Sequence, residues 1–249
     1  MKTAPQFTVV YEDEDIIAVN KASGLSVGGD RWDESRDRLD KLIGGVVPDL
    51  KIYIVHRIDR ETSGLVVFAR NEAAHRRLSL AFEGREVGKR YIAVVYGRPS
   101  WQETACDLPL IPNGNKQHLT IVDKFRGKKS LTRFSLMGSA GNVSILEAFP
   151  ETGRTHQIRV HAAALGFPVV CDMMYGNGKP VLLSAIKKNW RGDPYDERPL
   201  LTRLGLHAAE LTLTSHNITA PLPKDMTALV RQIQKIGKLR IPLSDIIRA

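Results

Sequence analysis

The stretch HRIDRETSG, residues 56–64, is the densest group of polar side chains in the chain. It lies between a short β-type run, Ile52 to Val55, and an apolar run, Gly64 to Ala69, that predicts a buried strand. Functional side chains concentrate on such connections because the rigid elements beside them hold them in place. Its aspartate, Asp59, stands among basic residues, and cationic neighbours keep a carboxylate ionised, as a nucleophile requires. A solvated loop with surface ion pairs is the alternative that spacing alone leaves open.

A second polar stretch, TGRTHQIRVH, covers residues 152–161. We expect Thr155 to cap a helix over Thr155 to Leu165. A helix N-terminus with a nearby arginine is a natural site for a phosphate or carboxylate group. His156 and His161 are five positions apart, so they do not form the i, i+4 pair of a zinc site. A capped amphipathic helix with an exposed arginine is the alternative interpretation.

A third stretch, GKRYIAVVYG, covers residues 88–97 and predicts a strand over Tyr91 to Tyr96. Alternation places Tyr91 on one face with Ala93 and Val95, and an aromatic ring beside basic residues can stack on an unpaired base. Half-buried packing is the more ordinary role for a tyrosine in a strand.

The rest of the chain predicts one domain of mixed strands and helices without an internal repeat. Residues 99–129 are interpreted as loop. Further elements are expected at a hairpin of Phe7 to Tyr11 and Ile16 to Asn20, a short helix ending near Gly44, a helix over Asn71 to Phe82, strands over Leu131 to Leu136, Val143 to Phe149 and Leu206 to Leu213, and a helix near Lys224 to Ile236.

Composition restricts the class of protein. The 249 residues include 36 Lys and Arg against 27 Asp and Glu, a net charge of +9 that favours polyanionic partners. Cys106 and Cys171 form no CxxC pair, so we expect two buried free thiols. Neither a signal peptide nor an apolar run of spanning length is present, and no phosphate-binding loop or GxGxxG motif occurs. We therefore expect a cytoplasmic protein that does not bind membranes.

Taken in order, these stretches resemble the RluA family of pseudouridine synthases. The resemblance also includes YEDEDIIAVNKASG at residues 11–24, GFPVVCDMMYG at 166–176 and LGLHAAELTL at 204–213, so it covers nearly the whole chain. Two departures are conservative: Ala22 replaces the proline of NKPxG, and Ile58 replaces the leucine of HRLD. The resemblance implies an α+β pseudouridine synthase fold, with a mixed, largely antiparallel sheet, flanking helices and a basic central cleft.

The resemblance also implies residue roles. Asp59 matches the catalytic aspartate that attacks a flipped uridine, Tyr91 the tyrosine that stacks on the base, and Arg159 the arginine that pairs with the aspartate. Arg57 matches the residue that fills the gap left in the RNA stack. We expect RNA contacts from basic residues of the same segments, namely Arg57, Arg60, Lys89, Arg90, Arg154 and His156. No metal and no organic cofactor are implied.

The expected protein is a monomeric isomerase of ribosomal or transfer RNA. Its catalytic domain is expected to span residues 1–249, without a separate N-terminal RNA-binding domain. A catalytically idle RNA-binding or ribosome-assembly factor and an RNA-processing hydrolase are the alternatives. The first is disfavoured by the intact Asp59, Tyr91 and Arg159, and the second by the lack of a metal cluster or an activated water with its own base. Specificity for one RNA is expected in the polar stretches 28–38, 112–129 and 186–203.

Overall fold

The computed structural model describes residues 5–29, 37–46 and 51–239. Contacts within the chain divide it into two compact units. The first contains the residues up to Lys89 together with His207–Pro221, and the second contains Arg90–Leu206 with the segment that follows Pro221. The prediction of one domain over the whole chain stays a prediction. None of the helices in the described ranges has the length and apolar character needed to cross a bilayer.

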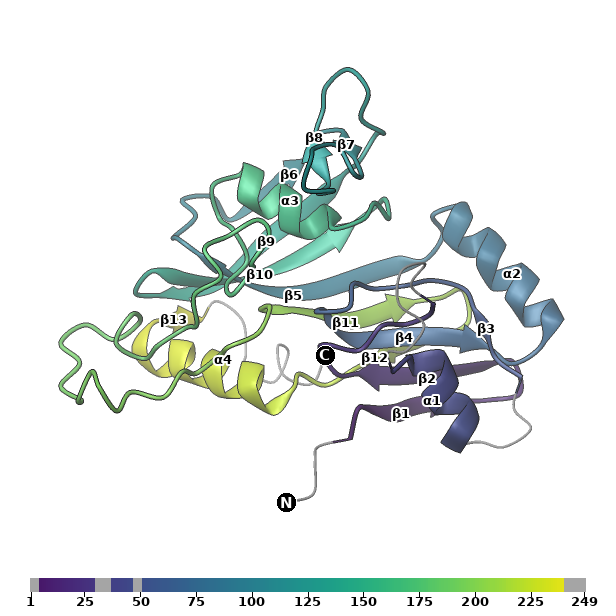
Figure 1. Cartoon of the computed structure of the whole chain (residues 1–249), viewed down its shortest axis with the longest axis horizontal. Coiled ribbons are helices and arrows are strands. Elements are labelled where there is room, and N and C mark those ends of the chain that lie inside the picture. Colours follow the sequence, from purple (N-terminus) through teal and green to yellow (C-terminus); the bar gives the residue numbers. More distant parts are fainter. Residues whose placement is uncertain (1–4, 30–36, 47–50, 240–249) are drawn as a thin grey trace. The chain divides into compact units, whose positions relative to one another are not determined.

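The first unit is built on strands in the order β1-β2-β4-β11 (Figure 1). All its strand pairs are antiparallel except β4 with β11, which run parallel where His207 faces Ser63. Helix α2 packs on β4. The elements are β1 Phe7–Glu12, β2 Ile16–Lys21, α1 Leu39–Val46, β3 Tyr53–Ile54, β4 Ser63–Ala69, α2 Glu72–Glu83, β11 Leu206–Thr212 and β12 Asn217–Thr219.

Short-range hydrogen bonds explain how the first unit begins. The Oδ1 atom of Asp13 accepts from the backbone N–H groups of Asp15 and Ile16, which closes the turn between β1 and β2. Asn71 caps α2 by accepting from the N–H of Ala74, and its side-chain amide donates to Asp15. The predicted hairpin and the predicted start of this helix are both confirmed.

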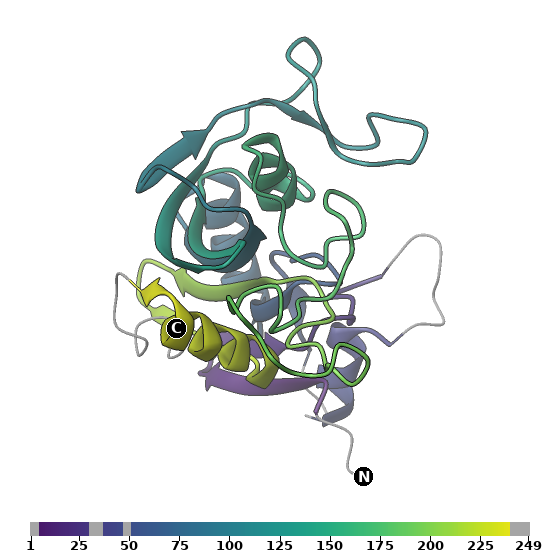
Figure 2. The same cartoon turned by 90° about the vertical axis from the view of Figure 1, so that its left-hand side faces the viewer.

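The second unit is built on an antiparallel sheet in the order β5-β10-β9-β13. Strand β6 pairs with β9 on the same edge as β13, at the other end of that strand. Helices α3 and α4 lie on opposite sides of β9 and β10 (Figure 1, Figure 2). The elements are β5 Gly88–Tyr96, β6 Glu103–Cys106, β7 Leu110–Ile111, β8 Ile121–Val122, β9 Thr132–Ala140, β10 Val143–Pro150, α3 Gln157–Ala164, α4 Lys224–Ile236 and β13 Lys238–Leu239.

Each unit has its own apolar core. In the first, α2 contributes Ala74 and Leu78 to a cluster with Leu65 and Val67 of β4. In the second, Ile158 and Ala162 of α3 pack on one face of the sheet. Both free cysteines are buried, as predicted. Burial of these faces supplies the main force that holds strands and helices together.

The expected α+β class with a largely antiparallel sheet is confirmed. Two local predictions are wrong. Residues 99–129 are not all loop, because β6 pairs with β9 and β7 pairs with β8. Thr155 does not cap α3, because the N-cap residue is His156, which adopts a left-handed conformation with φ 55° and makes no capping hydrogen bond through its side chain. Most of the polar stretch 28–38 lies outside the described residues.

Candidate active site

Asp59 lies in the loop between β3 and β4, in the first unit. The N–H of Thr62 donates to the backbone oxygen of Asp59 over 3.1 Å, which closes a turn. Ile58 is 9% exposed and anchors the loop in the core, whereas Asp59 is half-buried. A carboxylate on a tight turn with a buried neighbour is held in place yet accessible, which suits a reacting group.

The buried side chain of Lys21 anchors the loop that carries Asp59. The side chain of Lys21, at the end of β2, is fully buried, and its Nζ atom donates to the backbone oxygens of Ala22 and Arg60 over 2.9 and 3.0 Å. A buried ammonium is tolerated only where acceptors replace its water. Lys21 therefore ties the NKASG segment to the residue that follows Asp59.

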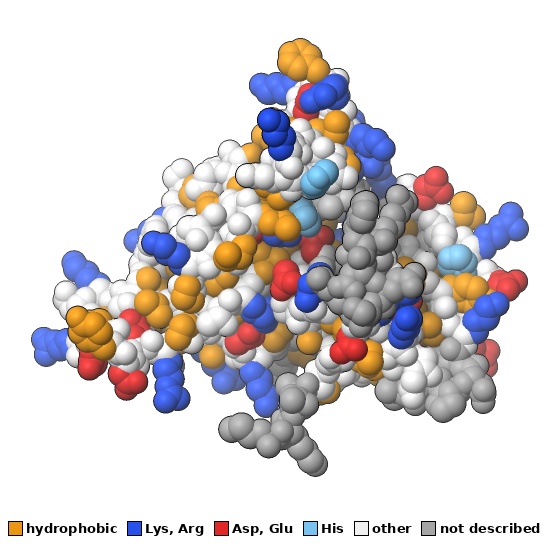
Figure 3. Space-filling model, in the orientation of Figure 1, with side chains coloured by type: hydrophobic (Ala, Val, Ile, Leu, Met, Phe, Trp, Pro, Cys, Tyr) orange, Lys and Arg blue, Asp and Glu red, His pale blue; other side chains and the backbone are white. Residues whose placement is uncertain are grey.

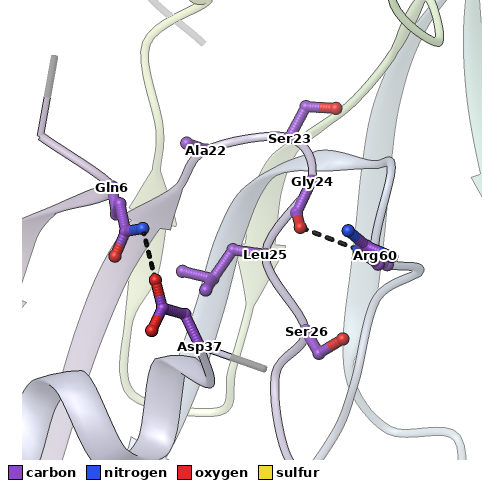
Figure 4. Close-up of a pocket in the computed structure, with 8 residues that line it drawn as sticks. All are labelled: Gln6, Ala22, Ser23, Gly24, Leu25, Ser26, Asp37 and Arg60. Atoms are coloured by element: carbon purple, nitrogen blue, oxygen red, sulfur yellow. Dashed lines mark hydrogen bonds between the residues drawn. The ribbon is translucent and has the colours of Figure 1, made fainter. Parts of the chain in front are cut away.

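Ser23 and Gly24 complete this connection. The N–H of Gly24 donates to the backbone oxygen of Arg60 over 2.9 Å. The Nε of Arg60 donates back to the oxygen of Gly24, also over 2.9 Å (Figure 4). The hydroxyl of Ser23 donates to the oxygen of Glu61 over 2.6 Å. Ser23, Gly24 and Arg60 line an open pocket of about 290 Å³. Its other lining residues are Gln6, Ala22, Leu25, Ser26 and Asp37.

His56 begins the same loop and has a structural role. Its Nε2 atom accepts from the N–H of Val67 in β4 over 2.9 Å, and its ring stacks on Phe82 with centroids 4.6 Å apart. Burial, together with the charge of Lys89, lowers the pKa of His56 from 6.5 to about 3. His56 is therefore a neutral acceptor and not one of the cations around Asp59.

The far end of the loop enters β4 through Ser63 and Gly64. The hydroxyl of Ser63 shares a hydrogen bond with Nδ1 of buried His207 over 3.0 Å, and the other ring nitrogen of His207 bonds the oxygen of Ala220. Gly64 has φ 117°, and a Cβ atom there would lie 2.2 Å from the oxygen of Ala208. Only glycine fits this parallel contact between β4 and β11.

Tyr91 and Arg159 lie in the second unit. Tyr91 is half-buried on β5 and packs against the core cluster that contains Ala93 and Val95, as the alternation predicted. Arg159 is 4% exposed, and its Nε and Nη2 atoms donate to the two carboxylate oxygens of Asp172 over 2.7 and 2.8 Å. The pairing of Arg159 with Asp59 stays a prediction.

Buried polar side chains also shape the loop before α3. Oε1 of Gln157 accepts from the N–H of Arg154 and the hydroxyl of Thr152, while Nε2 donates to Leu131 and Thr132. Thr152, Gln157 and His161 are all buried, so the side chains of these three residues serve the packing of this stretch. The same bonds place Arg159 on the first turn of α3.

The predicted RNA-binding residues differ in their surroundings. Arg57 and Arg60 are exposed, and Arg154 donates through its guanidinium to the oxygen of Lys129. Burial lowers the pKa of half-buried Lys89. Arg90 donates to Glu147 over 2.6 Å, and Nδ1 of His156 shares a hydrogen bond with the hydroxyl of Tyr175. Their contacts with RNA stay predictions.

Sequence reasoning missed Asp172. The signal was present, since Asp172 follows the apolar residues Val169, Val170 and Cys171, and a carboxylate in such a place needs a buried partner. The spacing could not say which cation that partner would be, because Arg159 lies 13 positions earlier on another element. Lys21 was missed for the same reason.

Comparisons with known proteins agree with these segments. A model of the RNA pseudouridylate synthase family matches residues 15–164. The chain is 36% identical to the dual-specificity RNA pseudouridine synthase RluA of Salmonella typhi, over 89% of this chain and 94% of that protein. It is 33% identical to ribosomal large subunit pseudouridine synthase D of Zymomonas mobilis, over 90% of this chain and 72% of the relative.

Solved structures show the same fold. Human RNA pseudouridylate synthase domain containing 1 superposes with a TM-score of 0.71 at 26% identity, covering 99% of this chain and 96% of the human one. Human RNA pseudouridylate synthase domain containing 4 gives a TM-score of 0.70 at 20% identity, covering 93% and 94%. The chain therefore belongs to the RNA pseudouridylate synthase family, and within that family it is an RNA pseudouridine synthase of the RluA type.

Proposed function

We propose that this enzyme isomerises uridine in ribosomal or transfer RNA, with Asp59 as the nucleophile. Of the relatives named above, one is described as a ribosomal large subunit pseudouridine synthase and the other as a dual-specificity RNA pseudouridine synthase. The observation that carries the assignment is the match of HRIDRETSG to the family segment with the catalytic aspartate, on a turn that Lys21 and Ser23 hold in place.

The reaction is redox-neutral. Asp59 attacks the flipped nucleotide at the ring or at the sugar, the bond between C1′ and N1 breaks, and the base rotates. C1′ then bonds C5, and the bond to Asp59 breaks, which regenerates the carboxylate. The proton on C5 leaves, and N1 gains a proton. Either route needs an ionised Asp59 as the covalent handle. Tyr91 stacks on the extruded base and is placed to help removal of the C5 proton, while Arg159 keeps the aspartate charged and oriented.

RNA contact is proposed for the basic residues Arg57, Arg60, Lys89, Arg90, Arg154 and His156, and for the polar stretch 112–129. Figure 3 shows Lys and Arg side chains around the projecting part of the second unit that carries β7 and β8. There, Phe125 is 98% exposed between Lys124 and Arg126. Cationic groups neutralise phosphates, and an exposed ring can stack on an unpaired base. The monomeric state and the cytoplasmic location stay predictions.

Replacement of Asp59 tests the proposal. Asp59→Asn keeps the shape and removes the attacking oxygen, so pseudouridine formation should become undetectable, because covalent catalysis of this kind supplies many kcal/mol of barrier lowering. The assay uses excess purified enzyme, long incubation and unmodified ribosomal and transfer RNA transcripts, with pseudouridines mapped at nucleotide resolution. The modified transcript and position identify the substrate.

Glu61→Gln is the matched control, because it neutralises an exposed carboxylate of the same turn. It should turn over like the parent. Folding and RNA affinity should survive in Asp59→Asn, since phosphate contacts dominate binding. Measurable pseudouridine from folded Asp59→Asn refutes the nucleophile, and failure of the parent on every transcript refutes the substrate class.

A further inference from the structure

Asp172 is a buried carboxylate with four donors around it. Its side chain is 0% exposed, and its Oδ2 atom accepts from Nε of Arg159. Oδ1 accepts from Nη2 of Arg159 and from the backbone N–H groups of Met174 and Tyr175, over 2.8, 2.9 and 3.1 Å. The carboxylate cannot turn without breaking several of these bonds, so it presents both oxygens to Arg159 in one orientation.

Tyr175 holds the guanidinium from a second direction. The centre of the guanidinium lies 5.1 Å from the centroid of the Tyr175 ring. The hydroxyl of Tyr175 accepts from the N–H of Thr120 over 3.0 Å and shares a 2.9 Å hydrogen bond with Nδ1 of His156. Tyr175 is thus tied at both ends, by its backbone to Asp172 and by its hydroxyl to the loop before α3.

We propose that Asp172 and Tyr175 are positioning residues that hold the Arg159 guanidinium in one orientation for uridine isomerisation. The inference rests on the proposed role of Arg159. A guanidinium has five N–H donors in one plane, and Asp172 binds two of them along one edge, which sets the direction of the other three. The Tyr175 ring sets the tilt of that plane.

Stability alone is a weak reason for such an arrangement. A buried ion pair often contributes no more than apolar side chains of the same volume, because both charges lose their water. A fixed orientation matters more for the rate of reaction when an arginine must contact a reacting carboxylate. A misplacement of about 1 Å in an active site can cost about 10²-fold in rate. We therefore expect the loss of Asp172 to lower the reaction rate by changing the orientation of Arg159.

The second unit contains a matched control pair. Nε and Nη2 of Arg203 donate to the two oxygens of Asp225, both over 2.7 Å, in the same bidentate geometry. Asp225, the residue replaced, lies outside the proposed catalytic and RNA-binding residues and outside the polar stretch 186–203. Asp225→Asn therefore removes one carboxylate charge from a contact of the same geometry, at a side chain that is 40% exposed.

The experiment compares Asp172→Asn with Asp225→Asn in the full chain. Three quantities are measured: the single-turnover rate at saturating enzyme, the Kd for the RNA substrate, and the melting temperature. We expect Asp172→Asn to slow the rate by about 10²-fold with little change in Kd. Asp225→Asn should lower the melting temperature and leave the rate near that of the parent. Equal rates in the two variants overturn the proposal.

If Asp172→Asn does not fold, Tyr175→Leu tests the positioning of Arg159 instead. It removes the ring under the guanidinium and leaves the carboxylate contact in place. A rate like the parent's overturns the role of Tyr175, and a slow rate with unchanged Kd supports it. Arg159→Ala separates this proposal from the proposed role of Arg159. A normal rate in Arg159→Ala refutes that role itself. A slow rate in Arg159→Ala with a normal rate in Asp172→Asn refutes only the positioning by Asp172.

Discussion

His56 illustrates how single residues in the HRIDRETSG segment divide between chemistry and structure. Its ring accepts from the N–H of Val67, and a protonated imidazole cannot accept. Protonation would therefore break a bond to the strand that follows Asp59. Lys21 is the opposite case, because its Nζ atom donates, to the backbone oxygens of Ala22 and Arg60.

A dependence of stability on pH follows for His56. Its pKa is about 3 in the folded protein and 6.5 as the reference value, so the unfolded chain binds more protons between these values. The stabilisation is complete above about pH 6.5 and is lost as the pH falls toward 3, by up to about 1.4 kcal/mol per pH unit. Burial lowers the pKa of His161 in the same direction, so both histidines contribute.

Chemical unfolding of the parent and of His56→Gln between pH 7 and pH 4.5 checks this expectation. The variant should be less stable at pH 7 but should lose less stability on acidification. His118→Gln, which changes an exposed histidine, should keep the slope of the parent. An unchanged slope in His56→Gln would contradict the assignment of a neutral His56.

At the scale of elements, the position of Asp59 depends on the parallel contact between β4 and β11. Gly64 faces Ala208 across this pair, and its left-handed φ brings the two backbones together. The Asp59 loop ends one residue before β4 begins. The register of β4 against β11 therefore decides where the loop leaves the sheet.

Gly64→Ala should destabilise the protein by about 3 kcal/mol or more, because strain at a positive φ adds to a clash with backbone atoms. Gly166→Ala is the control, since Gly166 has φ 87° and nothing within 4 Å of an added Cβ. It should lose only about 1 kcal/mol. The denaturant midpoints of the two variants measure these losses of stability. Equal losses would show that backbone strain at a positive φ, without the clash, accounts for the effect at Gly64.

At the scale of the whole molecule, the net charge of +9 governs the association with RNA. Affinity should fall by at least about 10²-fold between about 50 and 200 mM salt, because each neutralised phosphate releases counterions. Filter binding or fluorescence anisotropy over this range measures the slope. A flat dependence would contradict an electrostatic interface.

The same salt dependence, measured for single-residue variants, tests which side chains contact RNA. Arg154→Ala should weaken binding and reduce the salt slope by about 1, as expected when one phosphate contact is lost. Arg76→Ala removes an exposed arginine of α2 that is outside the proposed set, and it should leave the slope unchanged. Equal effects in both variants would indicate diffuse attraction.

The sequence by itself determined the local elements and the chemistry of the motifs. The β1–β2 hairpin, the Asn71 cap of α2 and the bounds of α4 follow from short-range patterns and were predicted. The family follows from ordered segments that keep Asp59, Tyr91 and Arg159. Such features need only neighbouring residues, because turn geometry, capping and periodicity act within a few positions of the chain.

Only the tertiary structure decided which side chains meet. Arg159 binds Asp172, Lys21 reaches Arg60 across 39 positions, and β6 is stabilised by pairing with β9 rather than by its own weak pattern. The physical reason is that a buried charge or an edge strand needs a partner but does not specify its place in the sequence. Packing of the two cores brings the partner there, and loop closure over long separations is a property of the folded chain as a whole.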